Sequence, residues 1–418
     1  MILNGELLMK KRVVVIAEYF PPRLGADRRI FELMKRLASR YDIHFITLPP
    51  SYTLFIRKID SYRAEQGHIH CEGMTGHSIA LPKILLRLWA NNFVLSFALT
   101  LTFLSLQMTK KIAQLKPEII IVNNTSVYTG LLGFICSRIL NKKLLVEYND
   151  LEALYATDLV RNRVNGFLLP TLRRTLVLVE DIIVRHGWKV TAITEFIRNY
   201  ASIRNTRKDI TVIPDGVDMD FFDANRISGK NTRLKHGVRP DETLCVYAGR
   251  IEDCAGANII LDAARLLETD KNIKFMIVGE GDPKLVTELS ECNNVILTGP
   301  TAKENVPEYL AAANIVLVPF PESIASHSIS PLKLFEALAM DKPVVASAVS
   351  GIKEVVSEDF DGLLVSADPE RWAAAVKELA NKNRNSASKV KSNRIIVSRK
   401  YGWNYLAEVF NKVLEDEI

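Results

Sequence analysis

The stretch VVVIAEYFPPRLGADRRIFELMKRLASRYDIHFITL, residues 13–48, decides the fold class. It begins with a β-branched run, residues 13–17, which is typical of a strand buried on both faces of a parallel sheet. A loop broken by two prolines and Gly25 follows, and after it comes a helical stripe of apolar residues. The run 43–48 predicts a second strand. Together these elements form a βαβ unit with a short glycine-containing loop before its helix.

The same alternation continues along the chain. Helical patterns separate the other strand-like runs, which are residues 119–124, 143–150 and 189–194 in the first half and 243–250, 274–281, 295–300, 314–320, 342–347 and 362–365 in the second. The first half closes with residues 209–222, a strand that runs into a turn with Pro and Gly. Two such halves predict an α/β protein with two Rossmann-like, doubly wound domains facing a cleft. Ligands of such sheets bind outside the carboxyl ends of the strands.

The segment 223–239 is polar and charged, as expected of a connection between domains. The predicted boundaries are an N-terminal domain at 1–210, an interdomain linker at 211–239, a C-terminal domain at 240–400, and a C-terminal helix at 401–418 that packs back on the N-terminal domain.

Composition narrows the class of partner. The 418 residues are 48% hydrophobic and 24% charged, which excludes a disordered chain, a collagen-like chain and a small disulfide scaffold. The net charge is +6, but no basic stretch has interleaved aromatics, so nucleic acid is not an expected partner. A phosphorylated ligand or an anionic membrane surface fits this charge better.

The five cysteines are scattered, with no CxxC pair that would indicate zinc or redox chemistry. Cys136 and Cys245 stand in apolar stretches and are expected in the core. This usage, with no signal peptide recognised in the first residues, predicts a reducing, cytoplasmic location.

One segment carries a family resemblance. Residues 318–356 read VPFPESIASHSISPLKLFEALAMDKPVVASAVSGIKEVV, with YAGR before them and DGLLV after them. EYFPPRLGADRR, residues 18–29, matches a donor loop of FxPxxGG type, and DITVIPDGVDMDFF, residues 209–222, matches a VIPNGVD motif. In this order the motifs resemble the retaining family-4, or group 1, glycosyltransferases of GT-B fold.

The resemblance implies a retaining, metal-independent glycosyltransferase. Its N-terminal domain would bind a lipid-linked or glycan acceptor, and its C-terminal domain would bind a nucleotide-diphosphate sugar as substrate, with no cofactor. Such an enzyme would act in the biosynthesis of surface polysaccharides or glycoconjugates.

The diphosphate leaving group carries at least two negative charges, which without a metal require basic side chains and helix N-termini. Arg250 follows a strand, and Lys333 stands where a helix opens after Ser330 and Pro331. By resemblance, Glu336 binds the ribose hydroxyls. The alternatives are a surface ion pair for Arg250 and a solvated helix position for Glu336. The full set of predicted donor-binding residues is Gly25, Ala26, Arg250, Gly279, Gly281, His327, Ser330, Pro331, Lys333, Leu334 and Glu336.

Asp150, in the loop VEYNDLE, is the candidate that orients or deprotonates the acceptor hydroxyl. The alternative is an N-cap of the next helix. In the front-face mechanism proposed for this class, the donor phosphate assists deprotonation, so no protein nucleophile is needed. Asp150, Arg250 and Lys333 form the predicted catalytic set.

The chain departs from the family pattern at four positions: Ser328 replaces a glutamate, Ala255 a lysine, Ala26 a glycine and Asn149 a histidine. These losses leave open a catalytically weak paralogue that binds a nucleotide sugar or a partner enzyme. A nucleotide-sugar epimerase is a third possibility, but it needs a cluster of carboxylates and histidine that the sequence does not display.

No metal site is predicted. Residues 218–220 and 359–361 look like DxD motifs, but both fall in segments that the family uses as loops. His68, His70 and His77 are expected at the surface or in loops rather than as ligands.

Two stretches predict membrane contact. Residues 88–109 carry no charge and are flanked by Lys83, Arg87, Lys110 and Lys111, but polar residues dilute them, which favours a covered or interfacial helix over a spanning one. Residues 160–189 mix arginines with Leu and Val. We expect peripheral, salt-sensitive attachment at the inner face of the cell membrane.

Overall fold

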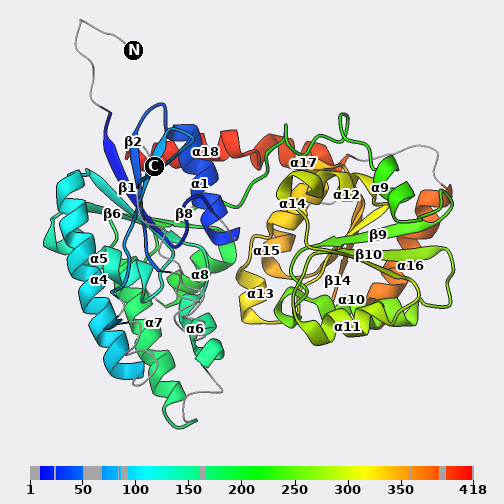
Figure 1. Ribbon diagram of the computed structural model, residues 1–418, viewed down its shortest axis with the longest axis horizontal. Helices are drawn as coiled ribbons and strands as arrows, with labels where there is room; N and C mark the ends of the chain where they lie inside the picture. Colours follow the sequence, from blue (N-terminus) through cyan, green and yellow to red (C-terminus); the bar gives the residue numbers. More distant parts are fainter. Residues whose placement is uncertain are drawn as a thin grey trace, which may run out of the picture. The chain divides into compact units, whose positions relative to one another are not determined.

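The computed structural model describes residues 10–22, 25–49, 68–82, 84–85, 93–160, 166–204, 206–356, 360–385 and 392–416. The chain forms two compact units, one of Met1–Ile213 with Leu406–Ile418 and the other of Pro214–Tyr405 (Figure 1). The chain therefore crosses between the units twice.

Most of the segment expected as a linker is instead part of the second unit. Val217 and Phe222 are buried in that unit's core, and Val217 pairs with Gly402 in an isolated β-bridge. From Leu406 on, helix α18 (Trp403–Leu414) belongs to the first unit, where the Tyr41 hydroxyl donates to Asn411 Oδ1 at 2.9 Å.

The first unit is built on an eight-stranded sheet in the order β3-β4-β2-β1-β5-β6-β7-β8, parallel except for the hairpin β3–β4. Its strands are β1 Arg12–Ala17, β2 Asp42–Thr47, β3 His68–Cys71, β4 Met74–Ser78, β5 Ile119–Asn123, β6 Lys143–Tyr148, β7 Lys189–Ala192 and β8 Thr211–Val212. Its helices are α1 Gly25–Leu37, α4 Phe93–Leu115, α5 Thr129–Ile139, α6 Glu152–Val160, α7 Leu169–His186 and α8 Glu195–Ile203, with α18 from the end of the chain.

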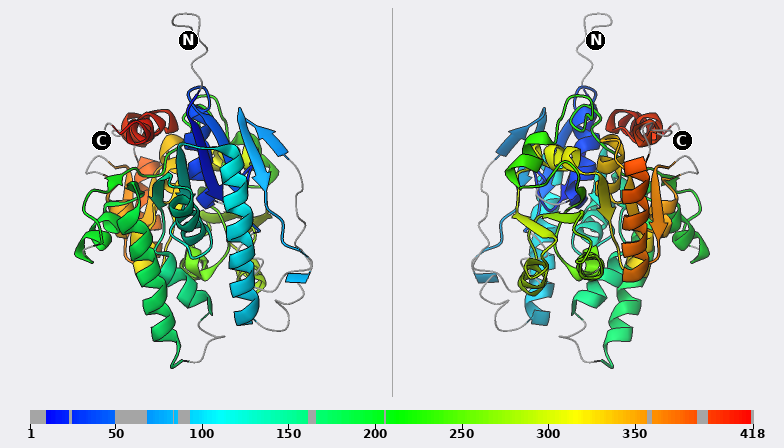
Figure 2. Two further views of the ribbon diagram at one scale, coloured as in Figure 1. Left: turned by 90° about the vertical axis from the view of Figure 1, so that its left-hand side faces the viewer. Right: turned by 90° about the vertical axis from the view of Figure 1, so that its right-hand side faces the viewer.

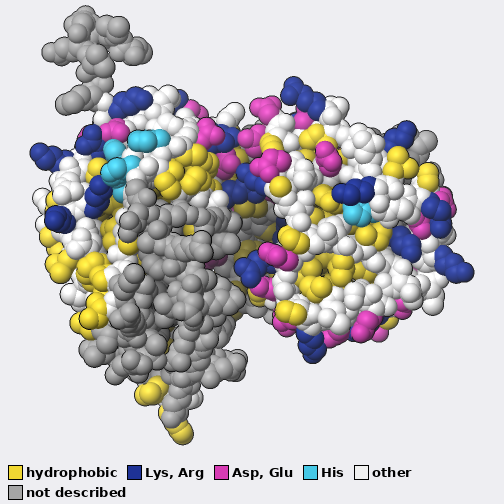
Figure 3. Space-filling view, viewed as in Figure 1, with side chains coloured by type: hydrophobic (Ala, Val, Ile, Leu, Met, Phe, Trp, Pro, Cys, Tyr) yellow, Lys and Arg dark blue, Asp and Glu magenta, His cyan; other side chains and the backbone are white. Residues whose placement is uncertain are grey.

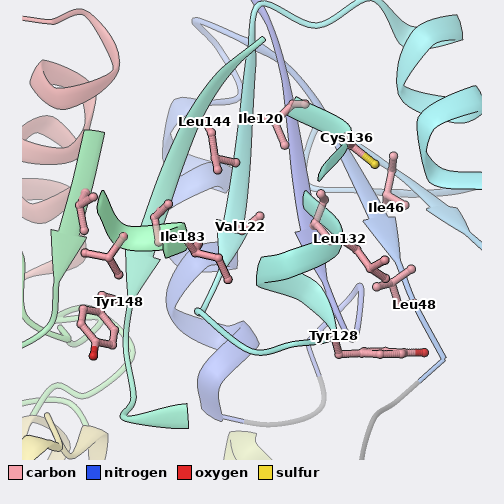
Figure 4. Close-up of a cluster of buried hydrophobic side chains, with 14 of the residues drawn as sticks. Ile46, Leu48, Ile120, Val122, Tyr128, Leu132, Cys136, Leu144, Tyr148 and Ile183 are labelled. Atoms are coloured by element: carbon pink, nitrogen blue, oxygen red, sulfur yellow. The ribbon is translucent and has the colours of Figure 1, made fainter. Parts of the chain in front are cut away.

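The apolar runs of this sheet are buried on both faces, as expected of parallel strands. Val14 and Ile16 of β1 share a cluster with side chains of α4, α5 and α7, and the intervening valines point to the opposite face. Figure 4 shows part of this cluster, where Leu132 and Cys136 of α5 lie against the strands. Cys136 is fully buried, which confirms its prediction as a core residue.

Helix α4 includes much of the stretch for which membrane contact was predicted, although residues 88–92 lie outside the described part of the chain. Leu104, Met108 and Ile112 are buried in the core, so α4 covers the sheet with one face. No helix among the described residues combines the length and apolarity that a bilayer crossing requires.

The second unit has six parallel strands in the order β11-β10-β9-β12-β13-β14. They are β9 Thr243–Ala248, β10 Ile273–Val278, β11 Val295–Gly299, β12 Ile315–Val318, β13 Val344–Ser347 and β14 Gly362–Val365. The helices are α9 Lys230–Lys235, α10 Ala257–Leu266, α11 Pro283–Ser290, α12 Val306–Ala312, α13 Ile324–Ser328, α14 Leu332–Ala339, α15 Ser350–Lys353, α16 Pro369–Asn385 and α17 Asn393–Lys400.

Two apolar clusters cover the two faces of this sheet. Val246 on β9 packs with Leu334 and Phe335 of α14, while Cys245 and Tyr247 of the same strand pack with α10 and α16. Cys245 is fully buried, as predicted. Both units are Rossmann-like α/β layers, which confirms the predicted fold class for each.

Candidate active site

Lys333 is a cation held against aromatic rings at the carboxyl ends of β9 and β12. Its Nζ lies 4.6 Å from the ring centroid of Tyr247 and 4.8 Å from that of Phe320. Nζ also donates to the Tyr247 hydroxyl at 3.4 Å. Among the ion pairs of the described residues, none includes Lys333. Burial lowers the pKa of Lys333 to about 8, against a smaller raising effect of Glu336.

Glu336 lies one helical turn after Lys333 on α14 and is 9% exposed. The alternative of a solvated helix position therefore does not hold. Leu334, another predicted donor residue, is fully buried in the core and fixes this face of the helix.

The turn before α14 is held in place by Ser330. Its Oγ accepts a hydrogen bond from the backbone N–H of Asp215 at 3.0 Å, and Ser330 is buried. Pro331 is the N-cap of α14 and offers no side-chain cap, so the first N–H groups of this helix receive no side-chain hydrogen bond from it.

Arg250 lies in a different setting from Lys333. Its guanidinium is 58% exposed and pairs with Glu252. This arrangement matches the alternative of a surface ion pair. The Arg250 carbonyl accepts from the Tyr247 hydroxyl at 2.6 Å, so its backbone belongs to the same turn as Lys333.

Gly279 and Gly281 let two strand-end loops approach each other. A Cβ on Gly279 would clash with the carbonyl oxygen of Gly249, and one on Gly281 would clash with that of Ile251. The Ile251 N–H donates to the Glu280 carbonyl at 2.9 Å across the same contact. Close packing of backbone against backbone thus accounts for both glycines.

Ser350 and Glu322 contact the ring nitrogens of His327. Its Nδ1 accepts from the backbone N–H of Ser350 at 3.1 Å, which leaves the proton on Nε2, 2.6 Å from Glu322 Oε1. Ser328, where the family has a glutamate, donates to the Ala325 carbonyl at 2.8 Å and is buried.

A polar network lies at the carboxyl ends of β5 and β6 in the first unit. Asn149 Nδ2 donates to Asn123 Oδ1 at 2.9 Å, and Asn123 Nδ2 donates to Asp27 Oδ1 at 2.8 Å. Asp27 stands in the first turn of α1, which begins with Gly25 and Ala26. Burial, partly offset by hydrogen bonds, raises the pKa of Asp27 to about 6.

Asp150 belongs to a carboxylate pair at the same edge. Asn124 Nδ2 donates to Asp150 Oδ2 at 3.3 Å and to Glu152 Oε1 at 2.5 Å. Burial raises the pKa of Asp150, and burial with the charge of Asp150 raises that of Glu152 well above its usual range. Asp27, Asn124 and Glu152 were not predicted. Their sequence signal was a polar residue directly after a buried strand or in a first helical turn.

The segments that look like metal motifs have local roles. Asp218 Oδ1 accepts from the backbone N–H groups of Asp220 and Phe221 at 3.1 and 3.0 Å, which caps a turn. Asp359 lies outside the described residues. Within the described part of the chain, no group of His, Cys, Asp or Glu side chains is arranged to hold a metal ion.

Comparison with known families identifies the chain. A family model described as Glycosyltransferase Family 4 matches residues 24–221, and one described as Glycosyl transferases group 1 matches residues 242–382. The chain belongs to the group 1, family-4 glycosyltransferases. The predicted family is therefore confirmed, and the two matches follow the two halves of the chain.

Relatives of this glycosyltransferase family match it over part of their length. The D-inositol 3-phosphate glycosyltransferase of Xylanimonas cellulosilytica is 31% identical over 213 residues, covering 47% of this chain and 49% of the relative. The lipopolysaccharide 1,2-N-acetylglucosaminetransferase of Salmonella typhimurium is 26% identical, covering 54% and 62%. The chain thus spans about half the length of the first of these relatives and less than two thirds of the second.

A solved structure matches over the full length. HepE of Anabaena, solved in complex with UDP and glucose, has a TM-score of 0.70 at 15% identity, covering 96% of this chain and 99% of that one. This likeness shows the GT-B fold.

Proposed function

We propose that this chain is a retaining, metal-independent glycosyltransferase that uses a nucleotide-diphosphate sugar. Its acceptor would be a lipid-linked or glycan substrate in the biosynthesis of surface polysaccharides. The names of two relatives, an inositol phosphate glycosyltransferase and a lipopolysaccharide sugar transferase, support this reaction class. The UDP complex of HepE supports a nucleotide sugar as donor.

The observation that carries the proposal is the position of Lys333. A buried ammonium next to two aromatic rings, with no ion pair to a described carboxylate, favours an anion as its partner. The diphosphate of the donor is such an anion. Glu336, one turn along the same helix, would then bind the ribose of that donor.

The acceptor would bind at the network of Asn124, Asn149 and Asp150. Asn149 Oδ1 is buried and has no hydrogen-bond partner in the described part of the chain, so an acceptor hydroxyl could donate to it. The Asp150 carboxylate is one residue away and could take up or orient that proton. No step requires a protein nucleophile if the donor phosphate assists.

The first test is a thermal-shift panel of nucleoside diphosphates, followed by donor hydrolysis without acceptor. An active enzyme slowly hydrolyses the donor that stabilises it, and NMR of the released sugar reports whether the anomeric configuration is retained. Turnover in excess EDTA should equal turnover with Mg²⁺. Activity that EDTA abolishes and Mg²⁺ restores would contradict metal independence.

The catalytically weak paralogue is kept as a second candidate because of Ser328. A buried hydroxyl bonded to the Ala325 carbonyl cannot supply the charge of the family's glutamate. Binding of a nucleotide sugar with no hydrolysis and no transfer to any extracted acceptor would favour this candidate.

Membrane attachment is proposed through α7 and the residues before it. Phe167 is 93% exposed and Leu168 is also exposed, while Arg173 and Arg174 line a pocket of about 310 Å³ between α6, α7 and α8. Exposed apolar side chains beside arginines suit an anionic bilayer, at about 1 kcal/mol for each basic residue near the surface. Arg161 and Arg163 of the predicted stretch lie outside the described residues.

Flotation with anionic liposomes at low and high salt tests this attachment. We expect the wild type to float only at low salt, and the variant Phe167→Ser with Arg173→Ser to stay at the bottom. A wild type that stays at the bottom at low salt would indicate a soluble acceptor.

A further inference from the structure

A pocket of about 480 Å³ lies at the β3–β4 edge of the sheet in the first unit. The hairpin β3–β4 and the segment after it form one wall, and the second half of α4 forms the other. Figure 2 shows the backbone of these elements. In the sheet, β2, β1 and β5 lie between β4 and β6. The pocket is therefore separate from the polar network around Asp150, which follows β6.

The lining of this pocket is basic. Lys110 and Lys111 come from α4, and His68 and His77 come from the hairpin. None of the ten lining residues that the structure describes is a carboxylate. Neither lysine takes part in an ion pair with another described residue. Figure 3 shows histidine side chains gathered beside Lys and Arg on this face of the unit. An arrangement of this kind attracts anions.

His68, His70 and His77 were predicted at the surface or in loops, and all three lie on the two strands of the hairpin. His68 and His70 are exposed, as predicted, whereas His77 is buried. Strand pairing places His68 opposite His77, and His77 also reaches His44 of the neighbouring strand β2. The prediction was therefore wrong for His77 alone, because a hairpin edge with polar alternation does not read as an apolar run.

The three imidazoles form a chain of short contacts. His44 Nδ1 lies 2.9 Å from His77 Nε2, and His77 Nδ1 lies 2.8 Å from His68 Nδ1. His44 Nε2 lies 3.1 Å from Asp42 Oδ1, which favours a proton on that nitrogen. His77 Nε2–H then donates to His44, and His68 Nδ1–H donates to His77. In this row of three imidazoles His77 is neutral, because one ring nitrogen donates a hydrogen bond and the other accepts one.

The surroundings keep His77 neutral. Burial is the largest cause that lowers the pKa of His77, to about 4, and the charges of Lys111, His44, His68 and His70 lower it further. The carboxylate facing this group of rings belongs to Asp42, which is paired with Arg12 at 2.6 Å. A ligand that brought negative charge into the pocket would raise the pKa of His77 again.

We propose that this pocket binds a phosphate group carried on a small polar molecule, with Lys110 and Lys111 as the charged contacts and His68 as a hydrogen-bond partner. Its volume exceeds that of inorganic phosphate and falls within the range of small-molecule sites, roughly 300–1,000 Å³. The polar lining by Gln107, Gln114 and Ser78 suits the hydroxyls of a sugar phosphate or of a phospholipid headgroup. The pocket belongs to the first unit, whereas Lys333 belongs to the second, so the pocket would be a second phosphate site on this chain.

Calorimetric titration of the full chain tests the proposal, with inorganic phosphate and glycerol 3-phosphate as soluble probes. Flotation with phosphatidylcholine vesicles containing phosphatidic acid is the lipid arm. The test variant is Lys110→Gln with Lys111→Gln, and the matched control is Lys142→Gln with Lys208→Gln, which removes two positive charges elsewhere on the same unit. Loss of two charged contacts should weaken binding about tenfold or more, while the control binds as the wild type does.

The second readout is the titration of ¹³C-labelled His77 by NMR. Saturating phosphate should raise the pH at which His77 protonates in the wild type and in the control, but not in the test variant. Binding of glycerol 3-phosphate without vesicle binding would assign a soluble ligand, and the reverse would assign a lipid headgroup. Equal phosphate affinity in the test and control variants, or a His77 titration that phosphate leaves unchanged, would overturn the proposal.

Discussion

Replacing Lys333 by methionine should reduce the affinity for a nucleoside diphosphate while leaving the fold intact. Methionine keeps the length and the apolar contacts with Tyr247 and Phe320 but removes the ammonium. Loss of a charged hydrogen-bond partner typically costs about 1.5–3 kcal/mol. That free energy corresponds to a roughly 10- to 150-fold weaker affinity at room temperature.

The pH dependence gives this prediction a second, independent measure. Lysine is charged below its pKa, which is about 8 at this site. At pH 9 only about one tenth of the free chain would carry the charge, so the wild type should bind the diphosphate up to about tenfold more weakly than under fully protonating conditions. The variant Lys333→Met should lack this decline between about pH 7 and 9.

Calorimetric titration at several pH values is the assay, and Lys271→Met is the matched control because Lys271 is an exposed lysine of the same unit. The control should keep both the affinity and the pH dependence of the wild type. Equal diphosphate affinity in Lys333→Met and the wild type would refute the assignment of Lys333 to the diphosphate. A wild-type affinity that does not change between pH 7 and 9 would refute the lowered pKa as its basis.

Three further predictions follow from the described contacts. Gly281→Ala should destabilise the fold by about 1–3 kcal/mol because the added Cβ meets the Ile251 carbonyl, whereas Gly166→Ala, with open space around it, should change the midpoint of thermal unfolding little. Arg29→Met should lower the free energy of unfolding in urea by about 3–5 kcal/mol, because it removes the charged partner, 2.8 Å away, of the fully buried Glu147 carboxylate and leaves it with the Thr191 hydroxyl; a loss below about 1 kcal/mol would contradict this. Arg250→Ala should weaken diphosphate binding about tenfold or more, because we expect the guanidinium to leave its exposed ion pair with Glu252 and bind the ligand. An unchanged affinity by calorimetry would show that Arg250 serves only the surface ion pair.

The β-branched runs of the central strands made the fold predictable. Residues 13–17 and 119–123 are buried on both faces, and such strands read as continuous apolar runs. The hairpin β3–β4 was missed for the opposite reason. Its sequence is short and rich in His, Thr and Gly, and an edge hairpin exposes alternate residues, so no apolar run marks it.

The part of the candidate site on α14 was predictable, because the spacing of residues along one helix determines which side chains share a face. Lys333 and Glu336 stand three residues apart and therefore share a face of α14. The polar network of the first unit was not predictable, because the hydrogen bond from Asn123 to Asp27 joins residues 96 positions apart in the sequence. Contacts of that kind depend on strand order, and the sequence of a single chain does not encode strand order in any local pattern.

The path of the chain has a consequence for synthesis. The first unit contains Met1–Ile213, yet it also uses Leu406–Ile418, where Asn411 accepts from Tyr41 and Glu408 pairs with Arg40 at 2.7 Å. A ribosome makes the first part early but supplies these last contacts only after the whole second unit, Pro214–Tyr405, has been made. The unit that is translated first is therefore completed last. Arg40 and Tyr41, which follow α1, lack their α18 contacts until the end of translation, whereas the contiguous second unit can already fold. Premature termination after residue 405 would then damage the beginning of the protein rather than its end.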